Sequence, residues 1–279
     1  MHGWRVPRGM PTYDEAMSPR PTAAFFDLDK TIIARSSSLA FNKPFQAGGL
    51  ISRRAMLRSA YAQFVYLVGG ADHDQMEKMR QFMSQLVAGW DVATVREIVA
   101  DTLHHVVDPI VYDEAVSLIE EHRGVGRDVI IVSTSGTEVV GPIGEMLGAD
   151  EVIATQLEIV DGHYTGGIAY YAYAEEKARA IRALAEERGY DLEGSFAYSD
   201  SITDVHMLEA VGHPHAVNPD RELRKVAAAN GWPILVFTKP VTLGSRLPPA
   251  RSTLAALALG GVGAVGWVLW RSRRSKIGA

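Results

Sequence analysis

The chain has 279 residues, of which 47% are hydrophobic and 22% are charged, with a formal net charge of −5 and no cysteine. This length allows one domain with an insertion, or two domains. The negative net charge argues against bulk binding of nucleic acid, and the lack of cysteine excludes disulfides, thiolate metal sites and a cysteine nucleophile.

The N-terminal residues 1–21 are rich in proline and glycine and show no hydrophobic period, so we expect a disordered lead-in. An apolar run from Ala23 to Phe26 then predicts a buried strand. Asp27 and Asp29 follow it, and carboxylates at the mouth of a buried strand are costly unless a metal ion or a cationic group compensates them. On these residues alone, an ordinary acidic turn is the simpler interpretation.

The next segment, residues 34–107, has a helical pattern in which Asp91 is placed to cap a helix. Between Asp29 and Asp72 the chain contains no acidic residue but several basic ones: Lys30, Arg35, Lys43, Arg53, Arg54 and Arg58. This part is either a solvated basic face or a surface that faces an anion, such as a phosphorylated substrate or acidic lipid headgroups. In the second interpretation Arg53 and Arg54 bind the substrate.

From about residue 109 the pattern alternates between helices and strands. We expect helices over 109–123, 137–147 and 175–188 and from about residue 220, and strands over 128–132, 152–160, 163–169, 195–198, 214–217 and 233–237. Asp161-Gly162 joins two of these strands and is typical of a tight hairpin. The alternation predicts a mostly parallel α/β sheet covered on both faces, with the reactive groups at the carboxyl ends of its strands.

The C-terminal stretch 254–270 has no charged residue and is followed by several basic ones. With the two residues before it, the stretch is long enough to cross a bilayer. We therefore expect a transmembrane segment over 252–270, a basic tail over 271–279, and a membrane-anchored protein whose catalytic domain is cytoplasmic. Small residues four apart, at Ala256, Gly260 and Ala264, would let two copies pair as a homodimer. A buried soluble helix is the alternative, which the glycines of this stretch disfavour.

Polar side chains follow three of the predicted strands, and a lysine begins a predicted helix. These residues are Asp27, Asp29, Ser133, Asp200, Asp204 and Lys177. Together they supply what phosphoryl transfer requires: a carboxylate nucleophile, a second carboxylate as acid and base, and oxygen ligands for Mg²⁺. A hydroxyl and a lysine can neutralise the phosphate oxygens.

These residues, in this order, are similar to the motifs of the haloacid dehalogenase superfamily, in its phosphoserine-phosphatase-like branch, subfamily IB. The run from Asp27 to Thr31 resembles the first motif, Ser133 the second, Lys177 the third, and the run 199–204 the fourth. The similarity covers roughly residues 22–238.

The resemblance implies an α/β fold, with a Rossmann-like parallel sheet and an inserted α-helical cap. The core would comprise residues 22–34 and 109–245, and the cap residues 35–108. The resemblance also implies a role for each motif residue. Asp27 would be the nucleophile, Asp29 the acid and base, and Ser133 and Lys177 the phosphate-binding groups; Mg²⁺ would be bound by Asp27, Asp29 and Asp200, and Asp204 would support the site.

The chain departs from phosphoserine phosphatases at Ser36, where those enzymes carry a glutamate that holds the amino group of the substrate. We therefore expect a Mg²⁺-dependent phosphatase that acts on a small phosphomonoester but is not specific for phosphoserine. Two alternatives stay open. One is a membrane-surface phosphatase that acts on a phospholipid headgroup or a lysophospholipid phosphate. The other is a membrane-tethered interaction protein on a catalytically retired fold.

Overall fold

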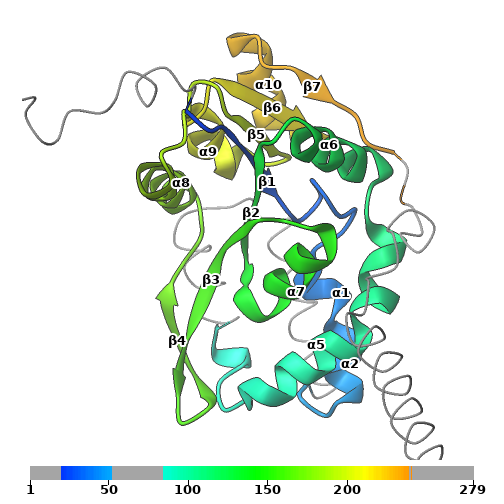
Figure 1. Cartoon of the computed structure of the whole chain (residues 1–279). Coiled ribbons are helices and arrows are strands. Elements are labelled where there is room, and N and C mark those ends of the chain that lie inside the picture. The colour runs from blue at the N-terminus through cyan, green and yellow to red at the C-terminus, as the bar shows by residue number, and fades with distance from the viewer. Residues whose placement is uncertain (1–19, 52–83, 239, 241–279) are drawn as a thin grey trace, which may run out of the picture. The chain divides into compact units, whose positions relative to one another are not determined.

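The computed structural model describes residues 20–51, 84–238 and 240 (Figure 1). The chain divides into two compact units, residues 1–242 and 243–279, and the described residues all lie in the first unit. Several predicted features lie outside the described residues. These are the lead-in up to residue 19, Arg53, Arg54, the transmembrane segment and the basic tail.

The predicted fold class included a transmembrane helix, and this part of the prediction is corrected. None of the helices within residues 20–51, 84–238 and 240 combines the length and the apolar character that spanning a bilayer requires. The prediction rested on the uncharged length of 252–270, which those ranges do not include. The fold that the structure supports is the α/β core without a membrane helix.

The described residues form a seven-stranded sheet in the order β4-β3-β2-β1-β5-β6-β7. All neighbouring strands run parallel except β3 and β4, which form an antiparallel pair. The strands are β1 (Ala23–Asp27), β2 (Asp128–Gly136), β3 (Glu151–Val160), β4 (His163–Tyr170), β5 (Phe196–Ser199), β6 (His213–Val217) and β7 (Ile234–Leu235). This confirms the predicted Rossmann-like parallel sheet.

The helices follow the sequence pattern closely in the second half of the chain. They are α1 (Ser37–Ala40), α2 (Asn42–Ala47), α5 (Val92–Val107), α6 (Asp113–Gly124), α7 (Thr137–Leu147), α8 (Glu175–Arg188), α9 (Val205–Glu209) and α10 (Arg221–Asn230), with short 3-10 helices at Asp108–Ile110 (η1) and Ile202–Asp204 (η2). Asp91 caps α5 as predicted, because its Oδ1 accepts a hydrogen bond from the Thr94 amide at 2.7 Å. The boundaries of the cap, 35–108, stay a prediction.

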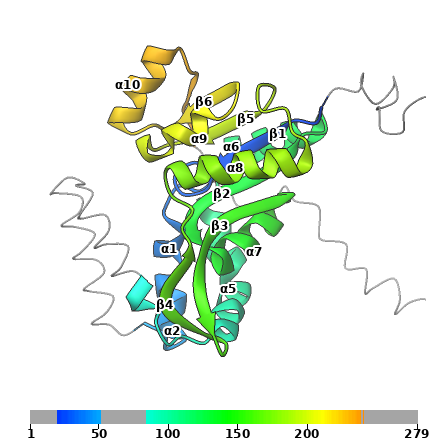
Figure 2. The same cartoon turned by 90° about the vertical axis from the view of Figure 1, so that its left-hand side faces the viewer.

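Helices cover both faces of the sheet (Figures 1 and 2). Phe25 belongs to the core cluster that includes Ile181 of α8 and Leu223 of α10. The next residue, Phe26, points the other way, and its ring lies 5.9 Å from that of His122 on α6. Successive side chains of a strand point to opposite faces, so a strand buried on both sides requires the continuous apolar run seen at β1.

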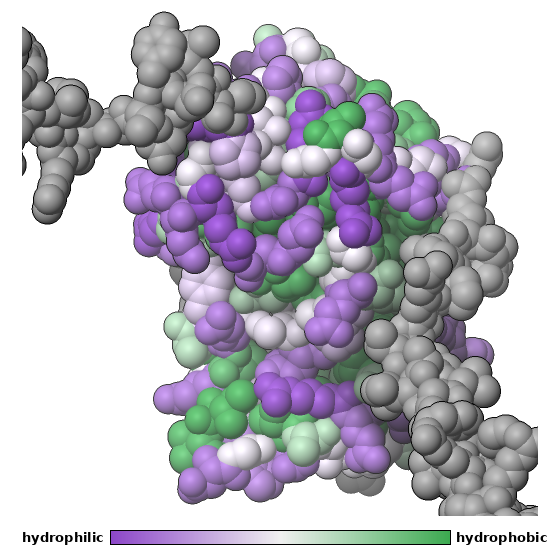
Figure 3. All heavy atoms as spheres, viewed as in Figure 1, coloured by the Kyte–Doolittle hydropathy of each residue, from purple (hydrophilic) through white to green (hydrophobic). Residues whose placement is uncertain are grey.

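The β3–β4 hairpin forms one edge of the sheet. Asp161 and Gly162 have φ values of 50° and 78°, as the predicted tight turn requires. The hairpin end contacts the first residue of α5, since the Val92 amide donates to the Gly162 carbonyl at 2.9 Å. Ile159 and Val160 of β3 are exposed. Figure 3 shows apolar and hydrophilic side chains side by side over the end of the molecule where this hairpin lies.

Candidate active site

The carboxyl ends of β1, β2 and β5 lie side by side, and the predicted site residues follow from their register. Asp27 pairs with Val132 of β2, so Ser133 is the next residue beyond that pair. Phe26 pairs with Tyr198 of β5, which brings Ser199 and Asp200 to the same edge. The end of a parallel sheet is where the strands leave room for a ligand. The structure thus brings together the first, second and fourth motifs.

Lys177 joins this group from the first turn of α8. Only 1% of its surface is exposed, and its Nζ donates to Asp27 Oδ1 at 2.7 Å and to Asp204 Oδ2 at 2.8 Å. Ser199 Oγ also donates to Asp204 Oδ2, at 2.7 Å. A buried ammonium group needs such partners, because the desolvation of an unpaired charge costs several kcal/mol. Lys177 therefore fixes two carboxylates from two different motifs.

Negative charge exceeds positive charge at the carboxyl ends of these strands. Burial raises the pKa of Asp27 to about 8, with the charges of Asp204 and Asp200 acting in the same direction and Lys177 opposing them. Burial also raises the pKa of Asp200 to about 7, against the charge of Lys30. Burial by itself would lower the pKa of Lys177, but the charges of Asp27 and Asp204 outweigh that effect and raise it. The site would thus be stabilised by a further cation.

The donor atoms suit a hard divalent cation. Within the described residues no group of three or more histidine, aspartate or glutamate side chains is arranged to hold a metal ion. Mg²⁺ does not need such a group, because proteins commonly bind it through one or two carboxylates, water and substrate phosphate. Asp27 and Asp200 offer this chemistry, and each has a raised pKa that a bound cation would relieve. The residues present therefore fit Mg²⁺.

The side chain of Asp29 is held by serines. Its Oδ1 accepts from the Ser37 amide at 2.8 Å and its Oδ2 from Ser135 Oγ at 3.3 Å. Burial raises the pKa of Asp29 above its ordinary value, and the hydrogen bonds from both serines act against that rise. The sequence interpretation did not assign Ser37 or Ser135. No periodic signal in the sequence indicates Ser135, because the pairing of β2 with β3 is irregular between Ser133 and Gly136.

The turn after β5 is fixed by a residue that sequence reasoning treated only as a helix start. Asp220 caps α10 by accepting from the Leu223 amide at 2.7 Å, and its second oxygen accepts from the Ile202 amide at 2.9 Å. Its own amide donates to the Asp200 carbonyl at 2.8 Å. Asp220 therefore connects α10 to the turn that carries Asp200 and Asp204.

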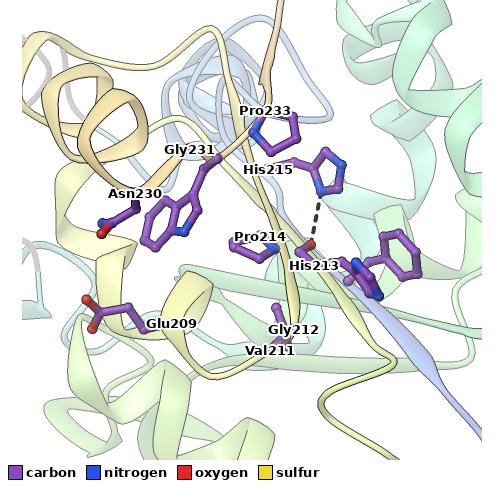
Figure 4. A pocket seen from close by; sticks show the side chains of 11 residues that line it. Glu209, Val211, Gly212, His213, Pro214, His215, Asn230, Gly231 and Pro233 are labelled. Atoms are coloured by element: carbon purple, nitrogen blue, oxygen red, sulfur yellow. Dashed lines mark hydrogen bonds between the residues drawn. The ribbon is translucent and has the colours of Figure 1, made fainter.

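A cavity of about 640 Å³ lies elsewhere, at the amino end of β6 (Figure 4). In Figure 4 Glu209 and Asn230 lie on one side of Pro214, and His213 and His215 lie on the other. None of its lining residues is a predicted site residue. Because reactive groups of parallel sheets gather at the opposite, carboxyl ends of the strands, we assign the chemistry to the carboxylate cluster and not to this cavity.

Comparisons with known proteins agree with this geometry. The sequence profile of the family described as haloacid dehalogenase-like hydrolase matches residues 24–209. The inhibition of morphological differentiation protein of Streptomyces azureus is 61% identical over 261 residues, which cover 91% of this chain and 94% of that protein. A probable phosphatase of Mycobacterium tuberculosis is 58% identical over 245 residues, covering 88% of this chain and 85% of that protein.

A solved structure has a related fold. The structure described as a phospho-aspartyl intermediate analogue of phosphoserine phosphatase superposes with a TM-score of 0.57 at 19% identity, over 80% of this chain and 96% of that chain.

The chain belongs to the haloacid dehalogenase-like hydrolases. Within this family it is a phosphatase, a phosphomonoester hydrolase, and its fold is similar to that of phosphoserine phosphatase. This confirms the resemblance and the enzyme class predicted from the sequence. The roles of the individual residues stay predictions.

Proposed function

We propose that this chain hydrolyses a small phosphomonoester through a covalent aspartyl-phosphate on Asp27. The observation that carries the proposal is the buried ammonium group of Lys177 between Asp27 and Asp204. A fixed positive charge beside the nucleophile is suited to bind the phosphate oxygens and to stabilise the charge that develops on them. The fold shared with phosphoserine phosphatase supports the same assignment.

The proposed hydrolysis has two steps, the formation of the aspartyl-phosphate and its hydrolysis. An oxygen of Asp27 forms a bond to phosphorus, and the bond from phosphorus to the ester oxygen breaks with its electron pair on that oxygen. Asp29 gives its proton to the departing oxygen. In the second step Asp29 takes a proton from water, the water oxygen forms a bond to phosphorus, and the bond from phosphorus to Asp27 breaks with its electron pair on the carboxylate. Ser133 and Lys177 bind the phosphoryl oxygens, while Asp204 holds Lys177 in position.

The proposed cofactor is Mg²⁺, held by Asp27 and Asp200. When bound it would neutralise charge on the phosphoryl oxygens. The prediction that Asp29 is a further ligand is not tested by the geometry, in which the Asp29 carboxylate is directed toward serines.

The proposed substrate is a small anionic phosphomonoester other than phosphoserine. Ser36 lies where phosphoserine phosphatases carry an amine-binding glutamate, and it is the residue before α1. The lipid alternative was based on the transmembrane segment, on the basic residues of the cap and on the missing amine-binding acid. The first is corrected above, and Arg53 and Arg54 lie outside the described residues, so we do not include this alternative in the proposal.

The test is turnover of p-nitrophenyl phosphate by wild type and by Asp27→Asn, in Mg²⁺ and in EDTA. We expect Asp27→Asn to lose about three orders of magnitude in kcat or more, because an amide cannot attack phosphorus. EDTA should abolish the wild-type rate. Asp191→Asn, a surface substitution of the same type, is the control. Wild-type rates for Asp27→Asn, or equal rates in EDTA and Mg²⁺, would overturn the proposal.

A further inference from the structure

Three serine hydroxyl groups meet beside the carboxylate of Asp29. Ser37 Oγ donates to Ser135 Oγ at 2.8 Å, and Ser38 Oγ lies 3.3 Å from the same oxygen. Ser135 Oγ in turn donates to Asp29 Oδ2 at 3.3 Å. Ser37 and Ser38 belong to α1, whereas Ser135 is at the end of β2, so the group joins two segments distant in the sequence.

The hydrogen-bonding capacity of Ser135 matches this arrangement. A hydroxyl group has one proton to donate and two lone pairs that accept. Here the proton is directed to Asp29 Oδ2, one lone pair accepts from Ser37, and the other is available to Ser38. In such a series of hydrogen bonds each hydroxyl group polarises the next, which strengthens the last hydrogen bond, from Ser135 to the Asp29 carboxylate.

An irregularity in the sheet directs Ser135 toward Asp29. Ser133 of β2 pairs with Ala154 of β3, but the next pair is Gly136 with Thr155, so β2 has two residues between the pairs and β3 has none. Irregularities of this kind redirect side chains and are frequent next to active sites. The Ser135 amide also donates to Ser133 Oγ at 3.2 Å, which fixes the backbone of this short segment.

The orientation of Asp29 is thereby set at both oxygens. Oδ1 accepts from the Ser37 amide at 2.8 Å and Oδ2 accepts from Ser135, so the plane of the carboxylate is fixed. The backbone of Asp29 is fixed as well, since Asp29 forms a bridge with Ile33. An acid that must give a proton to one particular oxygen of the substrate depends on such a fixed direction.

We propose that Ser135, supported by Ser37, is a positioning residue that orients Asp29 for proton transfer to the leaving oxygen. This inference rests on the proposed function, because it assumes that Asp29 acts as the general acid. Ser135 itself is assigned no contact with the reacting atoms. Its contribution should therefore depend on how much the leaving group needs a proton.

The experiment compares two aryl phosphates in the full-length chain. Phenolate is the conjugate base of a group with a pKa of about 10, like that of tyrosine, and needs protonation as it departs. The nitrophenolate ion is a much weaker base and departs without it. We expect Ser135→Ala to lower kcat/KM for phenyl phosphate about tenfold, part of what a general acid contributes, and to lower it clearly less for p-nitrophenyl phosphate.

Three further variants separate positioning from folding. Ser135→Thr keeps the hydroxyl and should restore most of the loss, and Ser37→Ala should show the same pattern to a smaller extent. In an Asp29→Asn background, Ser135→Ala should cost nothing more, because the group that it orients is already disabled. Thr165→Ala removes a hydroxyl that donates to the exposed carboxylate of Glu158, and as the control it should change neither rate.

Equal losses on both esters would overturn the inference alone, as would no loss on either or a failure of Ser135→Thr to recover activity. An additional loss in the Asp29→Asn background would also overturn it, because Ser135 would then act on another group. A wild-type chain that hydrolyses neither ester would overturn the proposed function, and this inference with it.

Discussion

Lys177 contacts Asp27 and Asp204, and all three side chains are buried. Lys177→Met should destabilise the fold by about 3–5 kcal/mol at pH 8, because two buried carboxylates lose their counter-charge. The loss should be smaller at pH 5. Burial has already raised the pKa of Asp27, so at low pH the carboxylate can take a proton in place of the ammonium partner.

Urea unfolding of wild type and Lys177→Met at both pH values measures this difference. The control is Arg188→Met on the same helix, whose guanidinium lies 2.9 Å from Glu151 in a largely exposed pair. Exposed pairs contribute at most about 1 kcal/mol, so the control should change stability little at either pH. A Lys177→Met loss that is no larger at pH 8 than at pH 5 would contradict the charge argument.

The site residues at the ends of strands could be predicted from the sequence, because each is a polar residue that directly follows an apolar run. Asp27, Ser133 and Asp200 satisfy that rule, and the parallel register brings them to one edge. The partners of Asp29 could not be predicted in this way. Ser37 and Ser135 reach it through an irregular strand pairing and a turn, and neither has a periodic signature.

At the scale of elements, α6 packs on the sheet through a buried histidine. Only 3% of the surface of His122 is exposed, its Nε2 lies 2.8 Å from Tyr198 Oη, and its Nδ1 lies 3.3 Å from Arg127 Nη1. A guanidinium group only donates, so Nδ1 accepts and the ring is neutral, with Nε2–H donating to the tyrosine. The imidazole ring of His122 also packs on the rings of Phe26 and Phe196.

This packing predicts a loss of stability in acid. Burial, together with the charges of Arg127 and His215, lowers the pKa of His122 from 6.5 to about 4. Below pH 6.5 the unfolded chain therefore binds a proton that the folded chain does not bind until about pH 4. The stabilisation from neutral His122 is complete above pH 6.5 and is lost as the pH falls toward 4, by up to about 3 kcal/mol.

The free energy of unfolding between pH 7 and pH 4 tests this prediction in wild type and His122→Phe. The phenylalanine keeps a ring against the sheet but cannot be protonated, so its stability should fall less steeply over this interval, although Tyr198 loses its partner and the variant starts from a lower value. His105→Gln, an exposed position on α5, should keep the wild-type slope. Parallel curves for His122→Phe and wild type would show that another group carries the acid sensitivity.

The elements themselves were predictable where local chemistry decides them. Asp91 and Asp220 cap helices, and Gly189 ends α8 with a φ of 74°. The transmembrane segment 252–270 was predicted from apolar length alone. It lies outside the described residues, whose helices are not long and apolar enough to cross a membrane. Hydrophobic length reports what a segment could bury, and the partner that covers it is set by the tertiary structure.

At the scale of the whole molecule, the site draws on β1, β2, α8 and the turn after β5, all within residues 27–204. The first compact unit ends at Thr242, and its last described residues are tied to the fold. Phe237 is buried, its amide donates to Asn218 Oδ1 at 3.0 Å, and Tyr112 forms a bridge with Pro240. These contacts define where the catalytic unit should tolerate a cut.

A chain that ends at Thr242 should keep the thermal midpoint of this unit and its kcat/KM on p-nitrophenyl phosphate, since it keeps the site and these contacts. A chain that ends at Val236 should be less stable by about 3 kcal/mol, because it loses the buried ring of Phe237 and its hydrogen bonds with Asn218. Thermal unfolding and turnover of both truncated chains beside the full chain provide the measurement. If the chain that ends at Thr242 loses activity, residues 243–279 take part in catalysis or folding. If the two truncated chains are equally stable, Phe237 does not anchor the unit.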